Sequence, residues 1–130
     1  MVQGWLLVAV GGGIGSVLRY ALNQQTAELS SALQFPIHTV GINILGCFAI
    51  GVVAAFTQNS SISTQTRLLL ATGLLGGFTT FSAFGYETVE LLQRGETIPA
   101  LVNLFGQPIL GALAAFAGIW AGGFLAIYLR

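Results

Sequence analysis

The chain has 130 residues, of which 55% are hydrophobic and only 6% are charged, and its formal net charge is zero. Because an ordinary soluble domain carries about 25% charged residues, this composition places the chain in a membrane and leaves no length for a soluble domain. The neutral balance excludes nucleic acid as a partner, and a single cysteine, Cys47, excludes an internal disulfide and a cysteine-based metal cluster.

The apolar segments predict a single all-α domain over residues 1–130, with four transmembrane helices. The first begins at the N-terminus and is expected to be a retained helix rather than a signal peptide, because no basic residue precedes its apolar run. Pro99 suits the first turn of the last helix, and Pro108 predicts a kink within it. The spans cover about residues 4–22, 39–56, 67–92 and 99–129, and the loops cover about 23–36, 57–66 and 93–97.

Pairs of glycines four residues apart occur in three of these spans. Such pairs allow two helices to approach closely, so they predict tight packing. The pairs are Gly11 with Gly15, Gly73 with Gly77, and Gly118 with Gly122.

The third span contains an interruption where a membrane helix should be most regular. The run from Gly73 to Phe84 combines glycines with three hydroxyl residues and three phenylalanines. In hydrocarbon a helix breaks only where the freed backbone groups face protein or a water-filled path, so this run predicts an ion or solute site. Exposed carbonyls would suit a small hard cation such as sodium, whereas exposed N–H groups and the hydroxyls of Thr79, Thr80 and Ser82 would suit an anion.

Two pairs of side chains are each spaced so that both members lie on one face of their own helix. Phe81 and Phe84 are three residues apart, and their positive ring edges would host an anion, although two phenylalanines at this spacing also suit a packed core. Asn43 follows Thr39 by four residues and lies one turn deeper. Its amide either bonds to another helix or donates to a permeating anion.

The arginines give no orientation. Four spans place Arg67 and Arg130 on one side of the membrane and Arg19 and Arg94 on the other, so neither side has the excess that marks the cytoplasm. Either one arginine dominates insertion, or the chain inserts both ways and pairs with an inverted copy.

The acidic residues favour a channel over an exporter or an enzyme. Glu87 and Glu90, late in the third span, are candidates to pair with Arg19 or Arg94 at the rim, or Glu87 caps polar groups near a vestibule. The first span lacks the deep carboxylate that a proton-driven exporter needs. The sequence has neither a Ser-His-Asp set nor a phosphate loop, so we expect no enzyme.

Together these residues resemble the Fluc family of fluoride channels, also called CrcB proteins. The resemblance covers essentially the whole chain, and its most specific part is the third-span motif. Its elements are Leu18-Arg19, Thr39-x-x-x-Asn43, Gly46, Gly73-x-x-Gly76-Gly77-x-Thr79-Thr80-Phe81-Ser82-x-Phe84, Glu87 and Arg94-Gly95.

This resemblance implies a passive fluoride-selective channel of the bacterial inner membrane that exports cytoplasmic fluoride. It implies a dual-topology, antiparallel homodimer with two pores and a central structural sodium ion, held by the backbone carbonyls of Gly76 and Thr79 of each subunit. Arg19 and Glu87 would lie at a vestibule or interface. The implied fluoride path consists of Asn43, Phe81, Phe84, Ser82, Thr39 and Thr80.

The chain departs from the family pattern at two places, and three alternatives stay open. Ala83 replaces a usual hydroxyl, and the fourth span has Asn103, Gln107 and Pro108 where serine or threonine is usual, so Gln107 is a candidate replacement donor. The alternatives are a small multidrug-resistance-type dual-topology exporter, a non-transporting accessory membrane protein, and a channel that requires a homologous partner.

Overall fold

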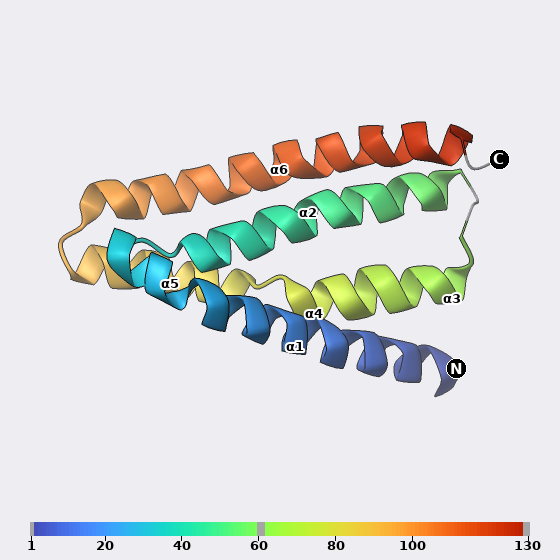
Figure 1. Ribbon diagram of the computed structural model, residues 1–130, viewed down its shortest axis with the longest axis horizontal. Coiled ribbons are helices and arrows are strands. Elements are labelled where there is room, and N and C mark those ends of the chain that lie inside the picture. The colour runs from blue at the N-terminus through green and yellow to red at the C-terminus, as the bar shows by residue number, and fades with distance from the viewer. Residues whose placement is uncertain (1, 60–61, 129–130) are drawn as a thin grey trace.

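The computed structural model describes residues 2–59 and 62–128 and is helical in every regular element of that range. Four helical stretches are long and apolar enough to cross a membrane. They lie side by side in an elongated bundle, with both termini at the same end (Figure 1). The predicted all-α, multi-pass membrane architecture is therefore confirmed. The elements are α1 (Val2–Leu33), α2 (Ile37–Gln58), α3 (Thr64–Arg67), η1 (Leu68–Leu75), α4 (Gly76–Phe78), α5 (Phe81–Gln93) and α6 (Thr97–Tyr128).

The polar loop predicted over residues 23–36 is wrong for most of its length, because α1 continues to Leu33. Several side chains in this stretch are good helix formers, and the Thr26 hydroxyl donates to the Leu22 carbonyl at 2.7 Å within the helix. The helix ends at Leu33, and the next residue, Gln34, has a left-handed φ of 50°. The predicted end of the fourth span at residue 129 lies outside the described residues.

The third membrane stretch is not a regular α-helix. In its first half, η1 is a π-helix of eight residues between α3 and α4, which the sequence did not predict. The backbone of Thr79 and Thr80 is then extended, and α5 begins at Phe81. The Thr80 hydroxyl caps this new helix by accepting a hydrogen bond from the Ala83 N–H at 3.2 Å. The chain therefore frees backbone polar groups between α4 and α5.

Glycine faces bring the helices together in two pairs. α1 packs on η1 and α4, and α2 packs on α6. Gly15 lies against the Leu74 carbonyl, and Gly118 lies against the Phe48 carbonyl, so closely that a Cβ at either position would collide with backbone. The close packing predicted from these glycines is confirmed.

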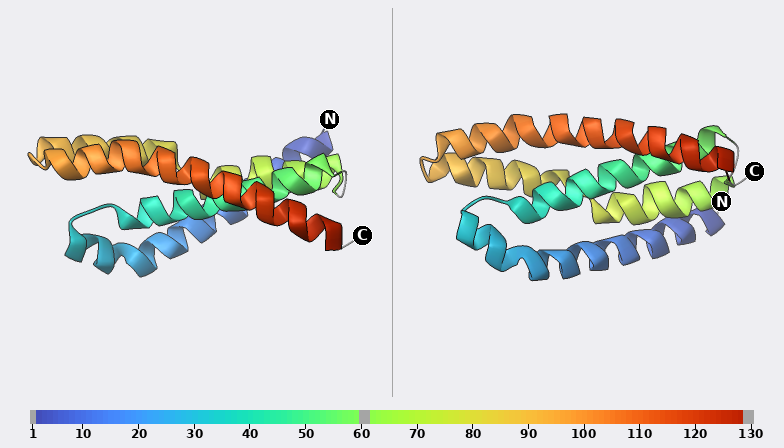
Figure 2. Two further views of the ribbon diagram at one scale, coloured as in Figure 1. Left: turned by 90° about the horizontal axis from the view of Figure 1, so that it is seen from above. Right: turned by 45° about the horizontal axis from the view of Figure 1, so that its top comes forward.

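The half of the bundle that contains α5 has a more open arrangement. There α5 lies along the first half of α6, and the end of α1 lies beside the start of α2. The α5–α6 pair diverges from the α1–α2 pair toward this end of the bundle (Figure 2). A tight turn joins α5 to α6, with Gly95 in the left-handed conformation at a φ of 79°. Its hydrogen bonds, from the Glu96 N–H to the Leu91 carbonyl and from the Gly95 N–H to the Leu92 carbonyl, are those of a Schellman motif.

Candidate functional site

Asn43 of α2 holds the extended backbone between α4 and α5. Its Oδ1 accepts from the Thr80 N–H at 2.8 Å, and its Nδ2 donates to the Thr80 carbonyl at 3.0 Å. In an unbroken α-helix the Thr80 N–H would donate to the carbonyl of Gly76. The Asn43 side chain therefore takes the place of a helical neighbour and releases the Gly76 carbonyl from the ladder.

A chain of side-chain hydrogen bonds leads away from Asn43 into the interior. The next acceptor is the Oε1 atom of Gln107, 2.9 Å from Asn43 Nδ2. Gln107 then donates to Asn103 at 2.8 Å, Asn103 donates to the Thr88 hydroxyl at 2.9 Å, and that hydroxyl donates to the Phe84 carbonyl at 2.8 Å. Asn103 is only 1% exposed. Asn103 and Gln107 are buried and Asn43 is half-buried. Their hydrogen bonds tie α6 to both α2 and α5, and every member has a partner.

A cavity of about 380 Å³ lies beside this polar chain. Two of its lining residues, Phe81 and Phe84, have ring centroids 5.4 Å apart at an interplanar angle of 44°. Phe81 is 82% exposed, whereas Phe84 is only 7% exposed. Phe81 therefore borders the cavity from the surface of the chain, and Phe84 borders it from the interior. Of the predicted ion-site residues, the cavity brings together Gly76, Asn43, Thr79, Thr80, Phe81 and Phe84.

The other predicted residues lie outside that lining. Ser82 is exposed, and its hydroxyl lies 3.3 Å from that of Thr80. The Arg19 guanidinium donates to the Thr79 carbonyl at 3.3 Å. Of the pairings expected at the rim, the structure forms Arg94 with Glu90, at 2.6 Å, and this hydrogen bond raises the pKa of Arg94.

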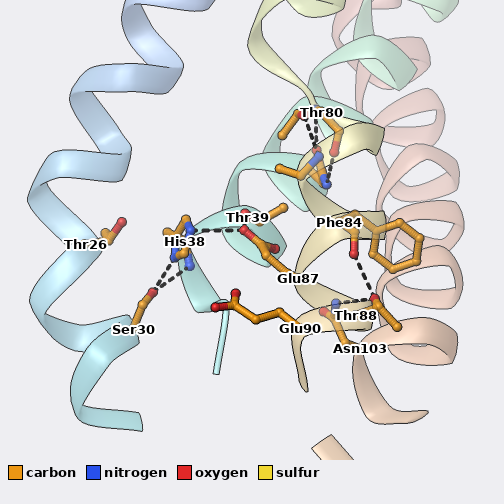
Figure 3. Close-up of polar contacts among 12 residues, drawn as sticks. Thr26, Ser30, His38, Thr39, Thr80, Phe84, Glu87, Thr88, Glu90 and Asn103 are labelled. Carbon is orange, nitrogen blue, oxygen red and sulfur yellow. Dashed lines mark hydrogen bonds and ion pairs between the residues drawn. The ribbon is translucent and has the colours of Figure 1, made fainter. Parts of the chain in front are cut away.

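Thr39 and Glu87 belong to a second polar cluster. The Thr39 hydroxyl donates to Glu87 Oε1 at 2.5 Å, and His38 Nε2 lies 3.2 Å from the same oxygen. The other ring nitrogen of His38 lies 2.6 Å from the Ser30 hydroxyl, which links the cluster to α1 (Figure 3). The second oxygen of Glu87 is buried and has no hydrogen-bond partner among residues 2–59 and 62–128. The cluster borders a second, more polar cavity of about 690 Å³ between α1, the start of α2, and α5.

Sequence reasoning missed Ser30, His38 and Thr88. A serine, a histidine and a threonine in isolation carry no pattern, because their partners come from distant parts of the chain. The one usable signal was the spacing of Asn103 and Gln107, which are four residues apart and therefore share a helical face.

The site can be compared with known proteins. The family described as CrcB-like protein, Camphor Resistance (CrcB) matches residues 6–119. The chain belongs to the CrcB family. It is 47% identical over 124 residues to a Thermus thermophilus protein named fluoride-specific ion channel FluC, covering 95% of this chain and 97% of that protein. Proteins of the same name from Rhizobium etli and Francisella philomiragia are 47% and 42% identical over 120 residues each. The alignments cover 92% of this chain and 94% of the Rhizobium protein, and 88% of this chain and 91% of the Francisella protein.

Membership in this family confirms two predictions. The resemblance read from the third-span motif is correct, and a chain of this family is not an enzyme.

Replacing Glu87 with alanine is expected to destabilise the fold by about 1–3 kcal/mol, because the hydroxyl of Thr39, a residue only 1% exposed, loses its acceptor. Thermal unfolding of the purified protein in detergent would measure the loss. Glu28→Ala is the matched control, because Glu28 is exposed on α1. Equal melting temperatures for the two variants would contradict the structural role of the Thr39–Glu87 contact.

Proposed function

We propose that the chain is a passive, fluoride-selective channel of the bacterial inner membrane that lets cytoplasmic fluoride leave the cell. The observation that carries this proposal is the cavity beside the extended backbone, where Asn43, Thr80, Phe81 and Phe84 meet. Relatives at 42–47% identity, named fluoride-specific ion channels, support the same ion.

The chemistry of the cavity suits a small, strongly hydrated anion. Such an ion enters a pore only where strong hydrogen-bond donors replace its water. The lining includes the Asn43 amide and the Thr80 hydroxyl as groups that can donate, and the rings of Phe81 and Phe84 would supply an apolar wall whose positive edges attract negative charge. Chloride is larger and accepts hydrogen bonds more weakly, so it would gain less from the same groups.

A passive pore is sufficient for this task. Hydrogen fluoride crosses the bilayer uncharged and dissociates inside, which traps the anion. The membrane potential, negative inside, then drives fluoride out through any open pathway. No coupled carboxylate in the first span is needed, which favours a channel over the multidrug-type exporter.

The functional unit in this proposal is an antiparallel homodimer of dual topology with two pores. Support comes from the equal number of arginines expected on the two sides of the membrane, because neither side then has the positive excess that fixes one orientation. One of these four arginines, Arg130, lies outside the described residues. Further support comes from Phe81, which lines the cavity and yet is 82% exposed in the single chain, so a second copy would cover it and close this side of the cavity.

A structural sodium ion is part of the same proposal, with the carbonyls of Gly76 and Thr79 as ligands. The Gly76 carbonyl suits this role, because Asn43 takes the N–H that an unbroken helix would offer it. The Thr79 carbonyl already accepts from Arg19, but a carbonyl oxygen has two lone pairs and retains one for a cation. The ion would supply positive charge at the centre of the dimer, where two helix breaks meet.

Sodium is expected to raise the free energy of unfolding of the purified protein. Above the dissociation constant the increase grows with the logarithm of the sodium concentration, and it reaches about 2.7 kcal/mol at roughly a hundred times the dissociation constant. The measurement is the melting temperature in detergent across a sodium titration, with N-methylglucamine keeping the ionic strength constant. A melting temperature that does not respond to sodium would remove the ion from the proposal and leave the anion pathway intact.

The decisive test of function is fluoride efflux from liposomes that contain the purified chain, followed with a fluoride electrode. We expect fluoride to leave when a potassium ionophore releases the charge, and to leave much faster than chloride. Efflux that requires a proton gradient would favour the exporter, and no efflux at all would favour an accessory protein. Efflux only after a homologous chain is added would show that a heterodimer is required.

A further inference from the structure

The hydrogen-bond chain through Asn43 has a fixed direction, because a backbone group stands at each end. The Thr80 N–H can only donate, so Asn43 must present its oxygen to it and its NH₂ group to Gln107. The Phe84 carbonyl at the other end can only accept. Every intermediate amide is therefore oriented, and Gln107 must present its oxygen to Asn43.

This orientation leaves Asn43 without a spare donor. Its amide nitrogen carries two N–H groups, and both are engaged, one by the Thr80 carbonyl and one by Gln107 Oε1. Gln107 and Asn43 both line the cavity, and the Gln107 oxygen lies 2.9 Å from the Asn43 nitrogen. An anion that approaches the Asn43 amide from the cavity therefore meets a carbonyl dipole that repels it and a donor that is already occupied.

The geometry points to Gln107 as a selectivity-determining residue, whose carbonyl competes with the permeating anion for the Asn43 N–H. This inference rests on the proposed anion channel. An anion passes only if it accepts a hydrogen bond more strongly than an amide oxygen does. Fluoride meets that requirement and displaces the Gln107 oxygen, whereas chloride does not.

The rest of the chain holds the competing carbonyl in place. The Gln107 NH₂ group donates to Asn103, and Asn103 is 1% exposed, so the Gln107 amide cannot flip by half a turn without leaving a buried acceptor unpaired, although its oxygen can still shift away from Asn43. Asn103 is thus a positioning residue for Gln107.

The test compares Gln107→Met with Gln107→Glu in the fluoride and chloride efflux assay. Methionine has a similar size, but its sulfur is only a weak acceptor, so the chloride-to-fluoride permeability ratio is expected to rise about tenfold. Glutamate retains an acceptor toward Asn43 and adds a negative charge that slows both anions, so the chloride-to-fluoride ratio is expected not to rise. Methionine and an ionised glutamate both lack the N–H group that Gln107 donates to Asn103. Gln107→Glu therefore controls for the loss of that hydrogen bond. Because both ions are measured on the same liposomes, the ratio does not depend on how much protein folds.

An unchanged ratio in Gln107→Met, with a wild-type protein that conducts fluoride selectively, would overturn the role of Gln107 alone. A wild-type protein without fluoride efflux would instead overturn the proposed function. If Gln107→Met does not reconstitute, side-chain amide NMR of the wild-type protein decides. Sodium fluoride should shift the Asn43 and Gln107 signals and sodium chloride should not, and equal shifts with both salts would overturn the inference.

Discussion

Asn43→Asp is expected to reduce fluoride efflux by about 100-fold or more. Aspartate retains the oxygen that accepts from the Thr80 N–H, but it replaces the NH₂ group with a second oxygen. That oxygen would face the carbonyls of Thr80 and Gln107, both of which are acceptors. The substitution therefore removes the donor that an anion needs and adds negative charge or an unpaired polar group beside the cavity.

Two further variants separate this effect from simple loss of the protein. Gln25→Glu introduces the same change of charge at an exposed position on α1 and should retain efflux. Asn43→Ser retains a short donor and should retain a fraction of the efflux. Gel filtration in detergent, run before each efflux assay, identifies variants that are folded. A folded Asn43→Asp protein with wild-type efflux would contradict the assignment of Asn43 to the anion path.

The sequence predicted the features of the fold that depend on local composition. Apolar segments of 18 or more residues define the spans, and the cluster of glycine and hydroxyl residues marked the segment in which Thr79 and Thr80 become extended. The π-helical turns of η1 were not predictable, because a wider backbone hydrogen-bond register leaves no distinct pattern in an entirely apolar segment. The polar end of α1 was misjudged because polar composition was taken for a loop, although its residues favour a helix.

The candidate site was predictable in its members but not in its connections. Asn43, Thr80, Phe81 and Phe84 stood out from their apolar surroundings. The hydrogen-bond partner of each polar atom could not be predicted, because an amide has both a donor and an acceptor end and only the packed structure orients it. The occupied donor of Asn43 is a property of that orientation, and it changes the expected role of Gln107 from a replacement donor to a competing acceptor.

The glycine face of α1 provides the second large expected effect. Gly15→Ala is expected to destabilise the protein by about 3 kcal/mol, because the new Cβ would collide with the Leu74 carbonyl and lie 2.8 Å from the Phe78 backbone nitrogen. The backbone of a packed helix cannot move aside to relieve such a collision, whereas the end of a flexible side chain can. The helix that is displaced leads directly into Thr79, so fluoride efflux per folded molecule should fall together with stability.

Gly13→Ala is the matched control for this experiment. It makes the same substitution half a turn away on the same helix, where a Cβ would meet nothing within 4 Å. Alanine there should leave efflux unchanged and stabilise the helix by as much as about 1 kcal/mol. The difference in melting temperature between the two variants therefore isolates the α1–η1 contact from helix propensity. If both variants melt together, α1 does not pack on η1 through Gly15, and the support for the extended segment must come from Asn43 alone.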